Sequence, residues 1–472
     1  MPADDIRKTP LWSWTALAAV TGATADGEPS QTISGVSIDT RSLQPGDVFV
    51  ALKDVRDGHE FVGAAFRAGA AAAIVSHGYR KLPDDRALLR VEDPLRALED
   101  AGRVARFRSD AKVVAVTGSV GKTGTKEMLR LCLTAYGATH ASEKSYNNHW
   151  GVPLTLARMP SETQFAIFEI GMNHAGEITP LTRMVAPDIA IITTVEPVHL
   201  GHFPSVEAIA DAKAEILLGV RRGGIAVLNR DNRYFERLRA EARRLELTVL
   251  SFGTHVEADV RAVSIRPDAE GTEVEIECPA GTVKYRVGIP GLHVAQNSLA
   301  VAAVLSRFGL DLKAALEPLA ALAAPEGRGA RQTITSAKGR ILLIDESYNA
   351  NPASMRAALA VLATVPRSNW PRRLAVLGDM RELGAEADRL HRELAEAVAS
   401  SGADRVFLCG PHMQSLDEVL PTETRGGSAL NSLELVPLLK SSLSAGDVVM
   451  IKGSLGTNMA PLVKTVRDWA VS

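Results

Sequence analysis

The segment 113–123 places glycines, a lysine and a threonine in an order that can bind phosphate. An apolar run at 113–116 predicts a buried strand, and a glycine-rich turn then leads into a helix that we expect to open at about Lys122. Glycines in such a turn let backbone N–H groups surround phosphate oxygens at the helix N-terminus. Lys122 would then reach the β- and γ-phosphates, and the Thr123 hydroxyl would ligate Mg²⁺. Val116 stands where the strict pattern has a first glycine, but the strand–turn–helix context still predicts a nucleotide site.

Two polar side chains follow predicted strands further along the chain. Glu169 ends an otherwise apolar run at 165–168, where a charged group must be paired or must bind a metal ion. His199 lies just beyond the strand predicted at 189–195, so both residues share one rim if the sheet is parallel. Taken alone, Glu169 has a salt-bridged acid as its alternative reading, and His199 a hydrogen-bonded structural histidine.

Lys213 lies on a helix face that should be buried. It follows Ile209 by four residues and precedes Ile216 by three, within a predicted helix at 205–220. Because burying an unpaired ammonium is very costly, this lysine must reach solvent along its stem, pair with a carboxylate, lose its proton or be covalently modified. The helix by itself favours the first of these.

A later part of the chain supplies further groups that suit a nucleotide. Arg328 lies in a small-residue, turn-rich stretch at 323–329 that reads as an interdomain hinge. The segment 345–352 adds carboxylates for ribose hydroxyls and Tyr348 for a base. Its asparagines and proline are equally ordinary turn and helix-start residues, so composition alone leaves this segment ambiguous.

The elements that must position these residues alternate between short apolar strands and helices, which predicts an α/β fold with largely parallel sheets. We expect three domains, at residues 1–108, 109–325 and 326–472. The segment 257–288 departs from the alternation and predicts a small antiparallel addition to the central sheet.

Composition excludes several classes of protein. The 472 residues carry 53 basic and 55 acidic side chains, so a net charge of −2 gives no reason to expect a nucleic-acid partner. Apolar runs fall far short of the ~20 residues that span a bilayer, and we expect no membrane span. Three cysteines far apart in sequence argue against a disulfide scaffold, and with no visible export signal they indicate the cytoplasm.

Taken together, the ordered motifs resemble those of the Mur ligases of peptidoglycan synthesis over essentially the whole chain. The matching residues include Ile38-Asp39-Thr40-Arg41, Asp57-Gly58-His59, the segment 117–123, Tyr146-Asn147-Asn148, Glu169-Ile170-Gly171, Ala212-Lys213-Ala214-Glu215, Asn297, Tyr348-Asn349-Ala350-Asn351-Pro352, Leu377-Gly378-Asp379-Met380-Arg381-Glu382-Leu383-Gly384 and Lys452-Gly453-Ser454. The motifs at 348–352 and 377–384 are in the forms typical of members that add a dipeptide, whereas the Asp-Asn-Pro-Arg motif of members that add diaminopimelate is absent.

The resemblance implies a fold and an activity. The fold would comprise a small N-terminal α/β domain that binds the UDP-sugar, a central P-loop ATPase domain and a C-terminal Rossmann-like domain that binds the dipeptide. The activity would be ATP-dependent ligation of D-alanyl-D-alanine to UDP-N-acetylmuramoyl-tripeptide through an acyl phosphate, as part of cell-wall biogenesis and hence of cell shape and division. The implied protein is a monomer with small-molecule partners.

The resemblance also assigns roles to individual residues. Catalysis would rest on Lys122, Lys213, His199 and Glu169, and two Mg²⁺ ions would be held by Thr123, Glu169, His199 and Lys213 after its carbamylation by CO₂. ATP would contact Thr117, Gly118, Ser119, Val120, Gly121, Lys122, Thr123, Asn297, Arg328, Tyr348 and Asp345, with Glu346 as the alternative acid for the ribose. The other substrates would contact Asp39, Thr40, Arg41, Asp57, Gly58, His59, Asn147, Asn148, Asn349, Asn351 and Lys452.

Two alternatives stay open at this point. The nearer one is another amino-acid-adding Mur ligase or a folylpolyglutamate synthetase. The other is of a different class, a P-loop switch or ATPase motor, which would hydrolyse nucleotide without an acyl acceptor and would not need Lys213.

Overall fold

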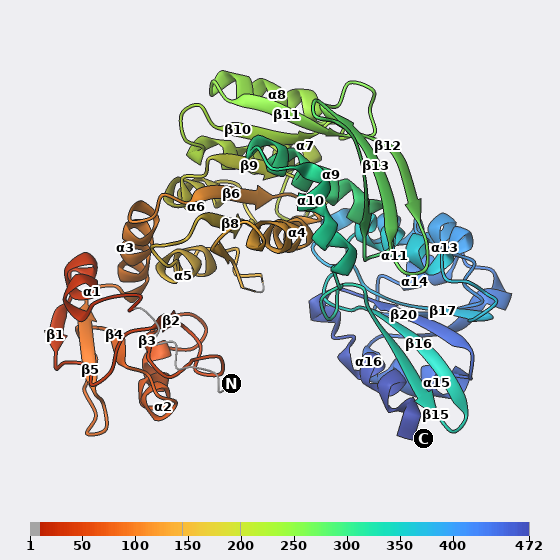
Figure 1. The fold of residues 1–472 in the computed structure, drawn as a ribbon. Coiled ribbons are helices and arrows are strands. Elements are labelled where there is room, and N and C mark those ends of the chain that lie inside the picture. Colours follow the sequence, from red (N-terminus) through yellow and green to blue (C-terminus); the bar gives the residue numbers. More distant parts are fainter. Residues whose placement is uncertain (1–9, 144, 199, 472) are drawn as a thin grey trace, which may run out of the picture.

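The computed structural model describes residues 10–143, 145–198 and 200–471, which form three α/β units, each with its own sheet. In Figure 1 the first and third units lie below opposite ends of the central sheet, so that the three form an arch. The predicted fold class is confirmed.

The first unit has a five-stranded sheet in the order β1-β5-β4-β3-β2, with only β1 antiparallel to its neighbour. Its strands are β1 (Thr24–Asp26), β2 (Gly35–Ser37), β3 (Asp47–Val50), β4 (Ala72–Ser76) and β5 (Ala87–Val91), and its helices are α1 (Trp14–Thr21), α2 (Val62–Arg67) and α3 (Pro94–Phe107). Helix α3 starts where the Asp93 carboxylate accepts the N–H of Leu95 and Arg96, with Pro94 in the first turn.

The central unit has a nine-stranded sheet in the order β14-β13-β12-β11-β10-β9-β6-β8-β7. The strands are β6 (Lys112–Thr117), β7 (Thr139–Ala141), β8 (Phe165–Glu169), β9 (Ile189–Ile192), β10 (Ile225–Asn229), β11 (Thr248–Gly253), β12 (Val260–Pro267), β13 (Thr272–Cys278) and β14 (Gly281–Val287). The first six in sequence pair in parallel, whereas β12, β13 and β14 form the expected antiparallel addition.

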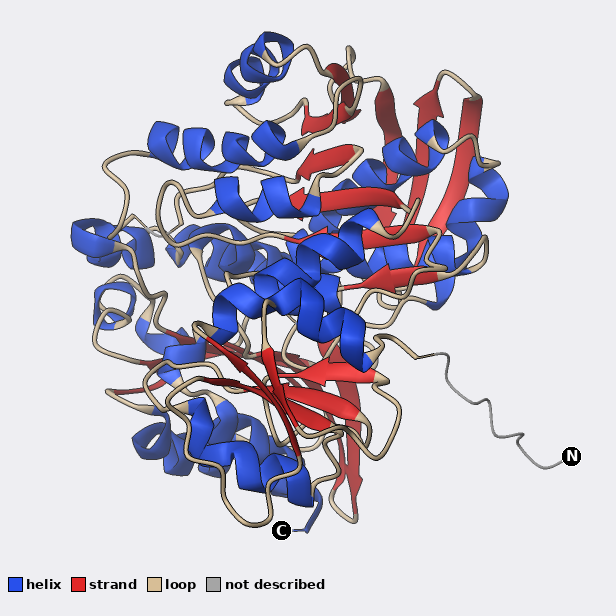
Figure 2. Ribbon diagram, turned by 90° about the vertical axis from the view of Figure 1, so that its left-hand side faces the viewer, coloured by secondary structure: helices blue, strands red, loops and turns tan. Residues whose placement is uncertain are grey.

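Helices cover both faces of the central sheet, as the side view in Figure 2 shows. They are α4 (Lys122–Thr134), α5 (Gly151–Ala157), α6 (Ile178–Val185), α7 (Val206–Ala214), α8 (Phe235–Arg244), α9 (Leu292–Arg307) and α10 (Leu312–Leu316). Two separate apolar cores result, one beneath α4 and α9 and the other beneath α5 to α8. Burial on both faces explains why the central strands read as continuous apolar runs.

The third unit has a six-stranded sheet in the order β15-β16-β20-β17-β18-β19, parallel except for the edge strand β15. Its strands are β15 (Ala330–Ser336), β16 (Gly339–Glu346), β17 (Arg372–Gly378), β18 (Arg405–Cys409), β19 (Arg425–Ala429) and β20 (Asp447–Lys452). Its helices are α11 (Pro352–Ala363), α12 (Ala387–Arg392), α13 (Ala395–Ser401), α14 (Gln414–Asp417), α15 (Ser432–Ser442) and α16 (Ala460–Arg467).

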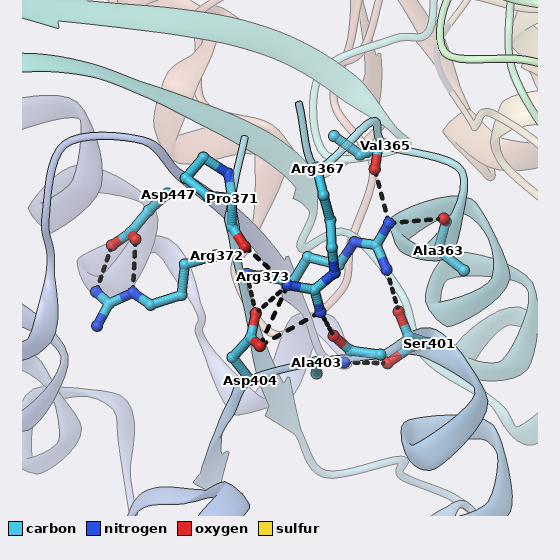
Figure 3. Close-up of polar contacts among 11 residues, drawn as sticks. Ala363, Val365, Arg367, Pro371, Arg372, Arg373, Ser401, Ala403, Asp404 and Asp447 are labelled. Atoms are coloured by element: carbon cyan, nitrogen blue, oxygen red, sulfur yellow. Dashed lines mark hydrogen bonds and ion pairs between the residues drawn. The ribbon is translucent and has the colours of Figure 1, made fainter. Parts of the chain in front are cut away.

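An ionic network secures the amino ends of the parallel strands in this third unit (Figure 3). Arg372 donates two hydrogen bonds of 2.7 Å to the buried carboxylate of Asp447, joining β17 to β20. Asp404, just before β18, accepts the backbone N–H of Arg373 at 2.7 Å and pairs with Arg367. The opposite, carboxyl ends of β16 and β20 face the central unit, because Glu346 and Lys452 at these ends line a cavity together with residues of that unit.

Within the described part of the chain, no helix combines the length and the apolar character that a membrane crossing requires.

Candidate functional site

The turn between β6 and α4 has the backbone conformation that the sequence predicts for a phosphate loop. Gly118 and Gly121 have φ of +149° and +87°, where side chains are disfavoured. A Cβ on Gly118 would lie 1.9 Å from Oγ1 of Thr193, and one on Gly121 would lie 2.4 Å from Oδ1 of Asn297. Helix α4 opens at Lys122, as expected. The turn thus directs its N–H groups and the helix N-terminus at one point.

Lys122 lies across this turn. Its Nζ donates a hydrogen bond of 2.7 Å to the carbonyl oxygen of Gly118. Burial lowers the pKa of Lys122, the Glu169 carboxylate acts in the opposite direction, and Arg328 lowers the pKa further. A polyanion placed beside these cations would be stabilised and would favour the charged form of the lysine.

A carboxylate and a hydroxyl meet at the carboxyl end of β8. The Thr123 hydroxyl donates a hydrogen bond of 2.9 Å to Oε2 of Glu169, and the Asn147 amide donates one of 2.7 Å to Oε1. Glu169 is only 1% exposed, so its carboxylate relies on protein groups rather than on solvent. Oxygen donors of this kind are the ligands that Mg²⁺ prefers.

The rim next to β9 fixes the other side of the turn. Ser119 donates its backbone N–H to the carbonyl oxygen of Thr194 at 2.9 Å, and its hydroxyl accepts the N–H of Glu196 at 2.9 Å. Thr193 donates its hydroxyl to the carbonyl oxygen of Val120. These hydrogen bonds therefore fix the glycine-rich turn at the carboxyl ends of β6 and β9.

The third unit reaches this turn through Arg328 and Tyr348. The Arg328 guanidinium lies 4.1 Å from the centre of the Tyr348 ring and donates a hydrogen bond of 3.1 Å to the hydroxyl of Ser145. This contact crosses from the hinge to the central unit. It brings a cation and an aromatic face to the mouth of the phosphate loop.

A cavity of about 430 Å³ between the central and third units gathers most of the predicted nucleotide residues. The predicted residues that line it are Ser119, Val120, Gly121, Lys122, Thr123, Asn147, Glu169, Asn297, Arg328, Tyr348, Asn349, Asn351 and Lys452. An apolar section formed by Met128, Ile289, Pro290, Val294 and Leu322 adjoins the phosphate loop. Cations, oxygen donors and an apolar slot in one cavity suit a nucleoside triphosphate with its metal ion.

The two acids at the end of β16 point in different directions. Glu346 lines the cavity, and its Oε2 lies 3.3 Å from Nζ of Lys452, which also donates to the carbonyl oxygen of Asn349 at 2.9 Å. Asp345 does not line the cavity. Its carboxylate accepts the hydroxyl of Ser347 at 2.6 Å and lies 3.5 Å from Arg467 on α16.

Two of the predicted asparagines also have local structural tasks. Asn351 caps α11 through a hydrogen bond of 2.9 Å from the N–H of Ser354 to its side chain. Asn148 accepts the N–H of Gly151 at 3.0 Å at the start of α5 and is not among the cavity residues. Thr117 and Gly118 lie beneath the turn and likewise do not line the cavity.

Lys213 is buried, as the helical spacing predicts. It lies in the last turn of α7 and is 3% exposed. Burial lowers its pKa well below the ordinary value, and the charge of Lys122 adds to the effect. Among the residues that the structure describes, no carboxylate pairs with it. The prediction that this lysine reaches solvent along its stem is therefore wrong. A neutral or covalently modified amine fits these buried surroundings. The predicted ligand His199 lies outside the described residues.

The predicted sugar-binding residues lie in the first unit, away from this cavity. Arg41 pairs with Asp39 at 2.6 Å, and Thr40 lies between them in the same turn. His59 lies 2.6 Å from the Asp57 carboxylate through Nδ1 and accepts the N–H of Ser76 at 3.0 Å through Nε2. Gly58 lies against the backbone of Leu52.

The cavity includes residues to which the sequence prediction gave no role. His293 lines it one helical turn before Asn297, and burial lowers the pKa of this histidine. The sequence did not predict a role for Ser145, because its partner Arg328 is 183 residues away and only the fold brings them together. For His293 a signal existed, since residues four apart on a helix share a face.

Comparisons with known proteins agree with this geometry. Residues 116–305 match the family described as Mur ligase middle domain, and residues 330–455 match the family described as Mur ligase, glutamate ligase domain. The chain is 36% identical over 441 residues to the UDP-N-acetylmuramoyl-tripeptide–D-alanyl-D-alanine ligase of Escherichia coli (strain K12), covering 93% of this chain and 94% of that protein. It is 32% identical to the ligase of the same description from Bacillus subtilis (strain 168), covering 96% of this chain and 97% of that protein.

Solved structures give the same result over nearly the full length. The crystal structure I of MurF from Acinetobacter baumannii superposes with a TM-score of 0.83 at 29% identity, covering 97% of this chain and 99% of that chain. The MurF ligase from Thermotoga maritima in complex with ADP superposes with a TM-score of 0.76 at 25% identity, covering 93% of this chain and 98% of that chain.

Proposed function

The chain belongs to the Mur ligase family, and from that premise we propose that it ligates D-alanyl-D-alanine to UDP-N-acetylmuramoyl-tripeptide with the cleavage of ATP to ADP and phosphate. The observation that carries the proposal is the shared cavity, in which the phosphate loop of one unit faces Arg328, Tyr348 and Lys452 of the next. Full-length similarity to several ligases of this description supports the choice of substrates.

The first step is transfer of the γ-phosphoryl group of ATP to the terminal carboxylate of the UDP-bound tripeptide. A carboxylate oxygen attacks phosphorus, the bond to the β-phosphate oxygen breaks, and ADP leaves. Lys122 and the N–H groups of the turn neutralise charge on the transferred group, so catalysis here is mainly positioning and electrostatic stabilisation. The observed contact of Lys122 with Gly118 holds its Nζ over the turn, ready to exchange a carbonyl for phosphate oxygens.

The second step forms the amide bond. The free amine of the dipeptide attacks the acyl carbon, loses a proton, and the tetrahedral intermediate expels phosphate. Water would hydrolyse the acyl phosphate, so the third unit must close over the central unit while it brings the dipeptide. Asn349, Asn351 and Lys452 lie at the cavity wall that this unit supplies.

The residues at the end of β8 fit a divalent cation. Thr123 and Glu169 present a hydroxyl and a buried carboxylate to one another at 2.9 Å, and Asn147 fixes the second carboxylate oxygen. These two residues would hold Mg²⁺, which when bound offsets the charge of the phosphates and orients them. His199 stays a proposed ligand of a second ion.

Lys213 fits a carbamate for an electrostatic reason. A buried, cationic lysine near Lys122 is unfavourable, whereas its neutral amine can add CO₂, release a proton to solvent and become a carbamate anion. That anion would be paired by Lys122 and by the metal ion. We therefore propose that Lys213 is carbamylated and that its carbamate helps to hold a metal ion.

The remaining assignments are also proposals. Residues 1–108 bind the UDP-sugar with Asp39, Thr40, Arg41 and the 57–59 turn, residues 109–325 bind ATP, and residues 326–472 bind the dipeptide. Asn297 and Tyr348 contact the adenine, Arg328 the phosphates and Glu346 the ribose, because Glu346 rather than Asp345 lines the cavity. A monomer in the cytoplasm is the expected working state.

The proposal is tested by substrate discrimination. The purified protein is incubated with ATP, Mg²⁺ and UDP-N-acetylmuramoyl-tripeptide, with phosphate release and product mass as readouts. D-alanyl-D-alanine should give the pentapeptide product, whereas single amino acids, or folate with glutamate, should not. Phosphate release unaffected by the dipeptide would overturn the choice of substrate, and hydrolysis without any acyl acceptor would favour a switch or motor.

A further inference from the structure

Lys126 is a completely buried cation that the reaction described above does not use. It lies on α4, three residues after Thr123 and four after Lys122, on the same face of the helix. Its exposure is 0%, and it is among the largest fully buried side chains of the described chain. Packing alone does not require a charge there, since apolar side chains of similar volume often replace buried ion pairs without loss of stability.

The contacts of Lys126 lead directly to the carboxylate at the end of β8. Its Nζ donates a hydrogen bond of 2.6 Å to the carbonyl oxygen of Ser142, the residue that follows β7. The Ser142 hydroxyl in turn accepts the backbone N–H of Glu169 at 3.3 Å. Lys126 therefore joins the helix that carries Thr123 to the backbone position that carries Glu169.

The same tie holds the start of a loop whose residues enter the cavity. Ser142 opens the stretch that continues to Asn147, whose amide binds Glu169 at 2.7 Å, and includes Ser145, which binds Arg328. The Glu169 carboxylate is thus oriented from two sides, by Thr123 on α4 and by Asn147 on this loop. Lys126 links α4 to the start of this loop through the Ser142 carbonyl.

The charge of Lys126 is balanced at the cavity wall. Glu127 pairs with Nζ of Lys126 at 2.9 Å and with Arg130 at 2.8 Å, and it lines the cavity. Burial alone would raise the pKa of Glu127, but hydrogen bonds from Arg130 and Lys126 lower it below its ordinary value. The buried lysine thus has an ionised partner and stays compatible with the fold.

We propose that Lys126 is a positioning residue for the metal-binding carboxylate, acting through Ser142 to hold Glu169 and Asn147 in the geometry that Mg²⁺–ATP requires. The inference rests on the proposed function because it requires a bound Mg²⁺ ion. It does not depend on which carboxylate and which amine the enzyme joins. Partners behind a metal ligand change metal affinity by about 10- to 100-fold when removed.

The test uses the full chain carrying Lys126→Met, which keeps most of the volume and removes the ammonium. Calorimetry measures the affinity for a non-hydrolysable ATP analogue with and without Mg²⁺. The gain in affinity that Mg²⁺ brings should be about tenfold smaller in the variant than in the wild type. The affinity measured without Mg²⁺ should agree between the two proteins within about twofold. In the metal-free protein, hydrogen exchange at the Glu169 amide and at residues 145–148 should accelerate about tenfold, because the Ser142 carbonyl loses the side chain that holds it.

Controls separate positioning from general destabilisation. Leu129→Ala removes another buried side chain of α4, from the apolar core, and should lower the melting temperature without shifting the Mg²⁺ dependence. Ser142→Ala keeps the carbonyl but removes the hydroxyl that holds Glu169, and it should weaken the Mg²⁺ dependence in the same direction as Lys126→Met. If Lys126→Met does not fold, Ser142→Ala carries the test.

Two results would overturn the inference. One is an unchanged Mg²⁺ dependence in Lys126→Met, or in Ser142→Ala when that variant stands in for it. The other is an equal shift in Leu129→Ala. Absence of ligase activity with the dipeptide in the wild type would instead contradict the proposed function. The binding and hydrogen-exchange measurements would still test the role of Lys126.

Discussion

The hydroxyl of Thr123 donates a hydrogen bond of 2.9 Å to the carboxylate of Glu169. Thr123 lies in the first turn of the helix after the phosphate loop, and Glu169 ends the neighbouring parallel strand β8. The carboxyl ends of adjacent parallel strands meet at one edge, which is where ligands bind in open α/β sheets. The fold therefore builds a cation site from residues 46 positions apart.

Replacing Glu169 by Gln should remove most of the ligase activity. The variant keeps the size of the side chain but loses the negative charge, and its amide N–H₂ replaces the acceptor oxygen of either Thr123 or Asn147. We expect kcat to fall by at least about 100-fold, since a direct metal ligand matters at least as much as the groups behind it. Steady-state kinetics over a Mg²⁺ series measures this. Activity within threefold of wild type would contradict a metal role for Glu169.

Replacing Gly118 by Ala should disrupt the phosphate loop. The new Cβ would lie 1.9 Å from Oγ1 of Thr193 in a backbone conformation with φ of +149°. The turn must shift, so we expect ATP binding to weaken at least about tenfold. Gly124→Ala is the matched control, because its Cβ meets only Asn297 at 3.8 Å within helix α4, and it should bind ATP within about twofold of wild type. Equal affinities of the two variants would argue against the strained turn.

Local pattern was enough to predict the phosphate loop, the strands around it and the burial of Lys213. Each of these depends on residues close in sequence, where strand and helix periodicity is readable. The acid at the end of β16 shows where such reasoning stops. Side chains alternate across a strand, so only one of Asp345 and Glu346 enters the cavity, and sequence alone does not say which face of β16 that is.

Contacts between separate elements of the fold were also beyond the sequence. Arg328 meets Ser145 and Lys126 meets Ser142 only after distant segments have folded together. Lys126 lies on the buried face of α4 at helical spacing from Leu129, so the reasoning that singled out Lys213 applied to it equally. The partner of each cation, in contrast, depends on tertiary packing.

Replacing Asp447 by Ala should destabilise the third unit without affecting nucleotide binding. Asp447 is 1% exposed and accepts two hydrogen bonds from Arg372 and one from the N–H of Ser444, at the amino ends of the strands (Figure 3). Leaving these donors unpaired should cost about 2–4 kcal/mol of unfolding free energy. Denaturant unfolding measures it. Lys464→Ala removes an exposed pair with Asp468 and should cost less than about 0.5 kcal/mol.

Asp268 should make stability depend on pH in the acid range. Hydrogen bonds from Arg286 lower its pKa to about 2, against the effect of burial, while the N–H groups of Glu270 and Gly271 contribute. A carboxyl whose pKa is lower in the folded chain stabilises it above the unfolded pKa, and this is lost as the pH falls toward about 2. The stability difference between wild type and Asp268→Asn should therefore be constant near pH 7 and shrink below about pH 4. Urea unfolding across this range tests it, and a difference that grows on acidification would contradict it.

Lys213 should carry CO₂ in the active protein. Its amine is 3% exposed and has a strongly lowered pKa, so it is neutral and reactive at a pH where an ordinary lysine is protonated. After incubation with ¹³C-bicarbonate, NMR should show a carbamate signal that is absent in Lys213→Ala. Removal of CO₂ should lower wild-type activity at least about tenfold, with recovery on adding bicarbonate, because a metal-site anion is lost.

Lys213→Ala should stay inactive under both conditions, whereas Lys112→Ala, at an exposed lysine, should respond like the wild type. Full activity of Lys213→Ala without bicarbonate would rule the carbamate out.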